Sequence, residues 1–559
     1  MIPVSFQNCF GWFHPASKDV GVVICNAYGH EDLSTHKGVR LMAESFADAG
    51  FPSLRFDYDG TGDSLGRDRD VNRVESWLAS VEAAVHWLRD TQHVTRVVLV
   101  GLRLGANFAT LTAQRLGTID GLILLAPIVQ GRNYLREMTA LTGVVGGAPD
   151  ARLVSEAHGL EACGFVISQE TQDAIKAIDL TKLNKAPAPQ ALVISVPGQI
   201  SSEKLVAHFD SLGCATTRED FDFYAEFLAD ATFARTPVEV IAKSRAWLEA
   251  HYADAGGREA GADLPPAMLH DPTFSEEMML FGPHANLAGV FCSPARPTAG
   301  PTVIFLNAGS NHHIGWARVT VDLSRRLASL GLSTFRMDVS GLGDSAALDS
   351  RADPAIYAID TMADVKAAID LLTSRGMNDI ALIGLCSGAY LSFHTAVEDE
   401  RVKRVMMVNL QRFIWKQGDS LDIVYTQTFQ ATGHYFAKMK DAETWKRVLR
   451  GEVKGVGIAR ELVSRLLNKI AATGKADPEI EKIRKGFTTL AARSVQMLMV
   501  MSSSDYARDE LDKYMGKDAK MFRALPNTRV EIIDGADHNI TPRWAREILA
   551  IKLCAFLKS

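Results

Sequence analysis

The stretch that decides the fold is residues 380–391, which read IALIGLCSGAYL. It passes from a short run of branched apolar residues, through the turn Gly384-Leu385-Cys386-Ser387-Gly388, into an Ala- and Leu-containing helical pattern. A sharp strand-to-helix turn strains its central residue, so small neighbours are needed to avoid clashes. The free N–H groups at a helix N-terminus favour an anion and populate thiolate. The pattern predicts a nucleophile elbow with Cys386 as the nucleophile; a buried core cysteine is the alternative.

The chain contains a long-period repeat. Residues 50–64, GFPSLRFDYDGTGDS, match residues 331–345, GLSTFRMDVSGLGDS. Further on, VVLVGLRLGANF at 97–108 matches the elbow stretch at 380–391. The nearly constant offset between the paired segments predicts a tandem duplication.

The repeat and the composition divide the chain into two domains. A length of 559 residues is too great for one hydrophobic core. Residues 254–267, DAGGREAGADLPPA, are rich in Gly, Ala and Pro and are expected to be a linker. We therefore expect one domain at 1–253 and a second at 268–559.

Both domains are expected to be of the α/β class. Short apolar runs alternate with helical patterns, which predicts a mainly parallel sheet flanked by helices in each domain, with a helical cap inserted in each. The strands expected in the second domain are 302–306, 333–337, 380–383, 404–408, 497–501 and 530–533. Met362, Val365, Ile369 and Leu372 recur at helical spacing, so this segment is expected to lay an apolar stripe on the sheet.

The composition argues against several classes of partner. A net charge of −6 gives no field to hold a phosphate backbone, so nucleic acid is excluded. The first residues lack a basic region followed by an apolar one, and no run of about 18 apolar residues occurs, so we expect a soluble cytoplasmic protein. Seven scattered cysteines are typical of free thiols in a reducing compartment. The absence of a phosphate loop or metal-binding helix motif predicts no metal and no nucleotide cofactor.

Two residues downstream of the elbow are expected to complete a catalytic triad. In α/β proteins with a nucleophile elbow, the acid of the triad follows a later strand and the histidine comes last. Cys386, Asp505 and His538 stand in that order. His538 would be the general base, and Asp505 would hold its imidazole in the right tautomer. Other carboxylates remain open as the acid: Asp509, Asp534 and Asp537.

An oxyanion hole is expected beside Cys386. The backbone N–H of Ser387 is one expected donor, and the loop Asn307-Ala308-Gly309-Ser310 is expected to supply the other. His312 and His313 follow this loop and are candidate pocket residues, although most such histidines only cap or solvate a loop.

On these residues both halves resemble the α/β-hydrolase superfamily, specifically the serine aminopeptidase-like or exosortase-associated hydrolases. The resemblance covers nearly the whole chain. The cysteine elbow is similar to that of dienelactone hydrolases and polyhydroxyalkanoate synthases, which implies hydrolysis or acyl transfer through a thioester intermediate.

The first domain departs from the catalytic pattern. Its matching turn, Gly101-Leu102-Arg103-Leu104-Gly105, has arginine at the nucleophile position. Because a guanidinium stays protonated, Arg103 cannot attack a carbonyl, and we expect this domain to be catalytically silent. It is expected either to stabilise its partner domain or to bind a carboxylate or phosphate through Arg103.

The expected cap of the second domain, residues 411–490, carries fifteen basic and nine acidic side chains with interleaved aromatics. It is expected either to admit an apolar acyl chain and attract coenzyme A or an acyl carrier protein, or to be an ordinary solvated helical face. Since thiolates attack thioesters readily, the leading hypothesis is a cysteine-dependent acyltransferase or thioesterase. The alternatives are a carboxylester or lactone hydrolase and a non-catalytic binding scaffold. A homodimer is compatible with each.

Overall fold

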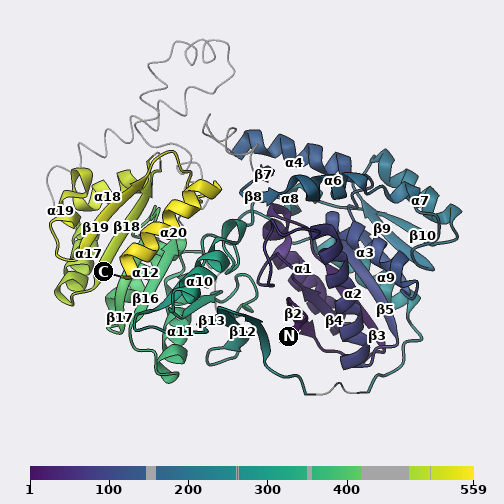
Figure 1. Ribbon diagram of the computed structural model, residues 1–559, viewed down its shortest axis with the longest axis horizontal. Helices are drawn as coiled ribbons and strands as arrows, with labels where there is room; N and C mark the ends of the chain where they lie inside the picture. The colour runs from purple at the N-terminus through teal and green to yellow at the C-terminus, as the bar shows by residue number, and fades with distance from the viewer. Residues whose placement is uncertain are drawn as a thin grey trace, which may run out of the picture.

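The computed structural model describes residues 1–145, 159–259, 261, 263–348, 356–416, 419, 477–503 and 505–558. It contains two large, mainly parallel sheets, each flanked by helices, which lie side by side (Figure 1). One sheet is built by strands of the first half of the chain, from Ile2 to Asp220, and the other by strands of the second half, from Ala267 to Ile533, so that its first strand begins at the last residue of the expected linker. The expected α/β class is confirmed.

The sheet of the first half has the strand order β1-β2-β4-β3-β5-β6-β9-β10. Its strands are β1 (Ile2–Phe6), β2 (Cys9–His14), β3 (Val20–Cys25), β4 (Ser53–Phe56), β5 (Arg96–Leu102), β6 (Gly121–Leu125), β9 (Gln190–Ser195) and β10 (Ala215–Asp220). The longer helices are α1 (His30–Asp48), α2 (Arg73–Gln92), α3 (Leu104–Leu116), α4 (Gly131–Val145), α6 (Gln169–Ala177), α7 (Ile200–Ser211) and α9 (Val238–His251). All strand pairs from β4 to β10 are parallel.

The sheet of the second half has the order β11-β12-β13-β15-β14-β16-β17-β18-β19. Its strands are β11 (Ala267–Asp271), β12 (Phe274–Phe281), β13 (Leu287–Pro294), β14 (Thr302–Leu306), β15 (Thr334–Met337), β16 (Ile380–Leu385), β17 (Val402–Val408), β18 (Gln496–Ser502) and β19 (Thr528–Ile533). The longer helices are α10 (Val319–Ser329), α11 (Met362–Ser374), α12 (Ser387–Glu398), α17 (Pro478–Ala492), α18 (Ala507–Met515) and α20 (Arg543–Leu557). All six expected strands are present.

The helices pack as their apolar periodicity predicts. Val365, Ile369 and Leu372 of α11 are buried against the second sheet, and Trp77 and Val81 of α2 are buried against the first. None of the described helices combines the length and the apolarity needed to cross a bilayer.

The edges of the two sheets meet through their antiparallel strands. β1 and β2 contact β11 and β12, and the N–H of Met268 donates to Ser5 Oγ at 3.1 Å. Phe10 and Trp12 of the first half share an apolar cluster with Met278 and Val290 of the second. The contact between the halves therefore has its own buried core.

The structure describes nearly all of the expected linker but only part of the expected cap of the second half. The expected linker lies along the first half, because the N–H of Arg258 donates to Ser17 O at 2.8 Å. Most of the expected cap of the second half, residues 417–418 and 420–476, lies outside the described residues. In the first half, the insertion between β6 and β9 contains α4, α6 and a hairpin of β7 (Leu160–Ala162) and β8 (Phe165–Ile167).

Candidate active site

Cys386 occupies a sharp turn between β16 and α12. Its backbone has φ 56° and ψ −115°, in the positive-φ region that non-glycine residues rarely adopt, and its N–H donates to Val408 O at 2.9 Å. A Cβ on Gly384 would lie 2.0 Å from the carbonyl carbon of Gly388, so only glycine fits there. The turn thus has the strained, small-residue geometry that the sequence predicts for an elbow.

The structure brings Cys386, His538 and Asp505 together. Asp505 follows β18 and His538 follows β19, so both come from the carboxyl-end edge of the parallel sheet. His538 Nδ1 lies 2.7 Å from Asp505 Oδ2, and the imidazole is near enough to the Cys386 thiol to shift its pKa. Of the alternative acids, Asp537 instead accepts the N–H of Thr541 at 2.7 Å.

The electrostatics of this group favour an ion pair between sulfur and imidazole. Burial opposes ionisation of the Cys386 thiol, but the positive charge and hydrogen bond of His538 outweigh it and hold the thiol pKa below its ordinary value. Burial also opposes protonation of His538, but Asp505 and Cys386 outweigh it and raise the imidazole pKa well above the usual range. The site therefore favours thiolate and imidazolium.

Two amide side chains that the sequence analysis missed hold the triad in place. Gln411 Nε2 donates to both carboxylate oxygens of Asp505 at 3.3 Å. Asn409 Nδ2 donates to His538 O at 2.7 Å, and its Oδ1 accepts the N–H of Ser502 at 2.7 Å. The sequence signal for both residues is their position just after β17, the strand that lies next to the elbow strand β16.

The loop after β14 is tied to the elbow. The N–H of Gly309 donates to Ser387 Oγ at 2.9 Å, and Asn307 Nδ2 donates to Asp338 Oδ1 at 2.7 Å. The Gly309 amide and the Asn307 side chain thus have partners within the protein that shape the loop. The backbone amides of Ser387 and Ala308 remain the expected donors.

Aromatic rings form a wall beside the sulfur. The hydroxyl of Tyr357 lies 3.3 Å from Cys386 Sγ. The Tyr357 ring stacks on Trp415, with centroids 5.0 Å apart, and meets Tyr390 edge-on at 5.4 Å. The rings therefore give the sulfur largely apolar, buried surroundings.

His312 and His313 lie at the contact between the two halves. His313 Nδ1 lies 2.7 Å from Asp338 Oδ2, and its Nε2 lies 2.6 Å from Asp63 Oδ2 of the first half. His312 stacks on His36 of the first half, with ring centroids 3.9 Å apart. Their described partners belong to this contact rather than to the triad.

Arg103 stands in an elbow of the same shape in the first half. Its backbone has φ 53° and ψ −117°, and its N–H donates to Leu125 O at 2.9 Å. Its guanidinium, however, is engaged by two carboxylates of the same half, Glu31 at 2.9 Å and Glu137. These internal carboxylates neutralise the Arg103 guanidinium within the first half.

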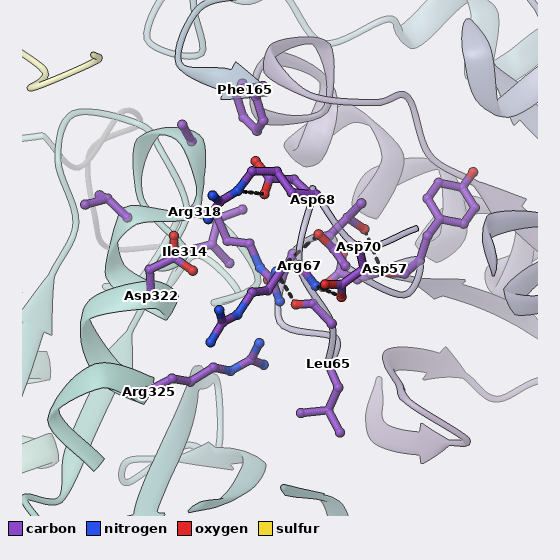
Figure 2. Close-up of a pocket in the computed structure, with 18 of the residues that line it drawn as sticks. Asp57, Leu65, Arg67, Asp68, Asp70, Phe165, Ile314, Arg318, Asp322 and Arg325 are labelled. Carbon is purple, nitrogen blue, oxygen red and sulfur yellow. Dashed lines mark hydrogen bonds and ion pairs between the residues drawn. The ribbon is translucent and has the colours of Figure 1, made fainter. Parts of the chain in front are cut away.

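A cavity of about 600 Å³ lies between the halves, as Figure 2 shows. Asp57 and Arg67 line it from the first half, and Arg318 and Asp322 line it from the second. Its lining contains no member of the Cys386 triad. This cavity and the candidate active site are therefore separate features.

Part of the chain is similar to known proteins. Residues 23–177 match the family model described as serine aminopeptidase, S33, a span that includes the Arg103 elbow. The quorum-quenching protein AidA of Acinetobacter baumannii is 28% identical over 134 residues, which cover 23% of this chain and 43% of that protein. The chain thus spans less than half the length of this curated relative.

Solved structures with partial similarity are also hydrolases by description. An α/β serine hydrolase homologue from Coxiella burnetii is 15% identical with a TM-score of 0.29, covering 53% of this chain and 100% of its own. A cold-adapted esterase from an Arctic intertidal metagenomic library is 13% identical with a TM-score of 0.30, covering 53% and 100%. From its own sheets and elbows, the chain has a fold of the α/β-hydrolase type.

Proposed function

We propose that this protein is a cysteine-dependent acyl-transfer enzyme, an acyltransferase or thioesterase that works through an acyl group on Cys386. One observation carries the proposal: Cys386 sits on a strained elbow at the carboxyl end of the sheet, beside a His538 imidazole whose Nδ1 lies 2.7 Å from Asp505 Oδ2. A structural cysteine needs neither a polarised imidazole nor a strained backbone.

The chemistry begins with attack of the Cys386 thiolate on a thioester carbonyl carbon. The tetrahedral oxyanion accepts hydrogen bonds from the Ser387 and Ala308 amides. The carbon–sulfur bond to the leaving group breaks, and the His538 imidazolium gives its proton to the departing thiolate. His538 then takes a proton from water or another acceptor, which attacks the acyl-enzyme and releases the Cys386 thiolate.

A thioester donor suits this site for two reasons. Exchange of one thioester for another costs little free energy, so a cysteine is readily acylated by such a donor. The rings of Tyr357, Tyr390 and Trp415 give the sulfur apolar surroundings, which suit an apolar acyl group. The basic composition of residues 411–490 favours an acidic carrier such as coenzyme A or an acyl carrier protein.

We further propose that the chain is a tandem duplicate, with a silent domain at 1–253, a linker at 254–267 and an active domain at 268–559. The support is that the parallel strands of both sheets follow the same order, and that both halves carry an elbow of nearly equal φ and ψ. Arg103 in the first elbow is incapable of nucleophilic attack. The first domain would then serve to stabilise the second.

The test compares kcat/KM for a thioester and an aryl ester of the same acyl chain. We expect a preference for the thioester and complete loss of turnover in Cys386→Ala. Cys554→Ala is the matched control, because Cys554 is also partly exposed but lies on α20 outside the triad. Preference for the aryl ester, with the same dependence on Cys386, would favour the carboxylester or lactone hydrolase. Turnover of neither substrate class by the wild type would favour the binding scaffold.

A further inference from the structure

We propose that Asp32, His36 and His312 form a binding site for a zinc-class divalent cation at the contact between the two halves. Asp32 and His36 belong to α1 of the first half, and His312 belongs to the loop after β14 of the second. One potential ligand atom from each residue lies within 4.8 Å of the other two. The set is one carboxylate and two imidazoles, a combination that zinc sites use.

The helix geometry suits shared coordination. Asp32 and His36 are four residues apart on α1, so their side chains lie on one face one turn apart. His312 approaches that face from the opposite half and stacks on His36. The two imidazole rings are nearly parallel, at 12°, so binding of one ion requires them to turn toward a common point.

Two atoms of the set are buried without a hydrogen-bond partner. They are Nδ1 of His312, a residue only 3% exposed, and Oδ1 of Asp32. Buried polar atoms are nearly always paired, so two orphans within one cluster of metal-ligand residues need an explanation. A bound cation would satisfy both atoms at once.

The surroundings of His36 match those of a metal-bound histidine. Its Nε2 lies 2.9 Å from Asp344 Oδ1, and Asp344 is itself held by Arg55 at 2.5 Å. Metal-binding histidines commonly donate their second N–H to a carboxylate, which fixes the tautomer and the ring orientation. This pairing assigns Nδ1 of His36 as the nitrogen that would bind the ion.

An ion has a route to this position. His36 and His312 line a hollow of about 240 Å³ together with Ser34 and Lys37, and Asp32 lines the larger cavity of about 600 Å³. The three residues thus line two cavities that lie on either side of the site. The sequence carries no metal motif here, because the ligands come from opposite halves.

The test uses full-length protein with the Cys386→Ser substitution, so that zinc does not bind the thiolate and imidazole of the candidate active site. After dialysis against chelator, Zn²⁺ is titrated in by calorimetry, and Co²⁺ binding is followed by visible absorption. We expect one equivalent of Zn²⁺, the strong visible bands of tetrahedral Co²⁺, and a Zn²⁺-dependent rise in Tm, because the ion joins the two halves.

The variants His312→Gln and Asp32→Asn, in the same background, are each expected to weaken binding on the order of 100-fold or more. His270→Gln is the matched control, because His270 is exposed on β11 away from the site and should leave the affinity unchanged. Circular dichroism shows whether each variant folds. If one variant does not fold, the Zn²⁺ affinity of the other variant tests the proposal. Absence of Zn²⁺ binding to the parent, or unchanged affinity in the folded variants, would overturn the proposal.

Discussion

Arg336 Nε of the second half lies 2.7 Å from Asp63 Oδ1 of the first half, and both side chains are buried. The reciprocal pair is also present, with Arg55 Nη1 of the first half 2.5 Å from Asp344 Oδ1 of the second. The two arginines occupy matching positions of the repeat, and so do the two aspartates. The halves therefore meet as two copies related by an approximate two-fold axis would, each giving the other an arginine and an aspartate.

The ion pairs between the two halves are expected to stabilise the folded protein. Asp63→Asn removes the charge that pairs with Arg336 and His313, leaving buried cations without a partner. We expect the free energy of unfolding to fall by about 3–5 kcal/mol, measured by urea denaturation. Asp68→Asn is the control, because Asp68 lies in the same loop but its side chain is 35% exposed and pairs with Arg69 at 3.5 Å. A loss of about 0–1 kcal/mol is expected there; equal losses in the two variants would contradict the account.

The arginine of the first elbow is predicted to be structural. Arg103→Met leaves Glu31, whose side chain is 4% exposed, without its ion-pair partner, so we expect a loss of about 3–5 kcal/mol in unfolding free energy. Glu137→Gln should cost about 0–1 kcal/mol, because the Glu137 side chain is 51% exposed. Folded Arg103→Met should keep the turnover of wild type. Loss of turnover without loss of stability would assign Arg103 a role in catalysis.

The lowered thiol pKa predicts a pH profile. Thiolate is present above the Cys386 pKa, so alkylation of Cys386 by iodoacetamide should rise with pH to a midpoint below the ordinary thiol pKa of about 8.5. His538→Ala removes the stabilising positive charge while burial still raises the pKa, so the midpoint should move above that value. Peptide mapping by mass spectrometry follows Cys386 alone. A wild-type midpoint at or above that of His538→Ala would refute the ion pair.

Thioester turnover should have an upper pH limit as well. The proton that His538 gives to the leaving thiolate is present only below the raised imidazole pKa. The rate should therefore rise through the lowered Cys386 pKa and fall again through the raised His538 pKa. A profile measured as kcat/KM against pH, with no descending limb up to the unfolding pH, would remove His538 from the acid role.

The choice of triad acid is also testable. Asp505→Asn keeps the shape of the side chain but loses the charge that orients His538, so kcat should fall roughly 10³–10⁴-fold. Asp509→Asn, in the first turn of α18, should leave kcat unchanged. The reverse result, with Asp509 essential and Asp505 dispensable, would reassign the acid.

Much of the second half could be predicted because its signals are local. The six parallel strands are short apolar runs, and the elbow and the triad order lie in the sequence itself. The antiparallel strands β11 to β13 were not predicted, because residues such as Gly289 and Ser293 interrupt their apolar pattern. The positions of Gln411 and Asn409 depend on how neighbouring strands end, which no local pattern records.

The contact between the halves was not predicted for a different reason. His313 and Arg336 contact their partner Asp63 only in the folded chain. The partners lie far apart in the sequence, and the local spacing of apolar residues carries no information about such distant pairs. One signal was present: Arg55 and Asp63 recur as Arg336 and Asp344, although the nucleophile does not recur. A residue pair that recurs in both copies of a repeat, where the catalytic residue does not, indicates an interface between the copies.

The central claim is that Cys386 carries the acyl group, and intact-mass spectrometry tests it most directly. The protein is mixed with an acyl thioester, quenched in acid within the first turnovers, and compared with Cys386→Ala and Cys554→Ala. The account predicts one added acyl mass on wild type and on Cys554→Ala, located on Cys386 by peptide mapping, and none on Cys386→Ala. An acyl adduct that persists on Cys386→Ala, or turnover of the thioester by that variant at the wild-type rate, would contradict it.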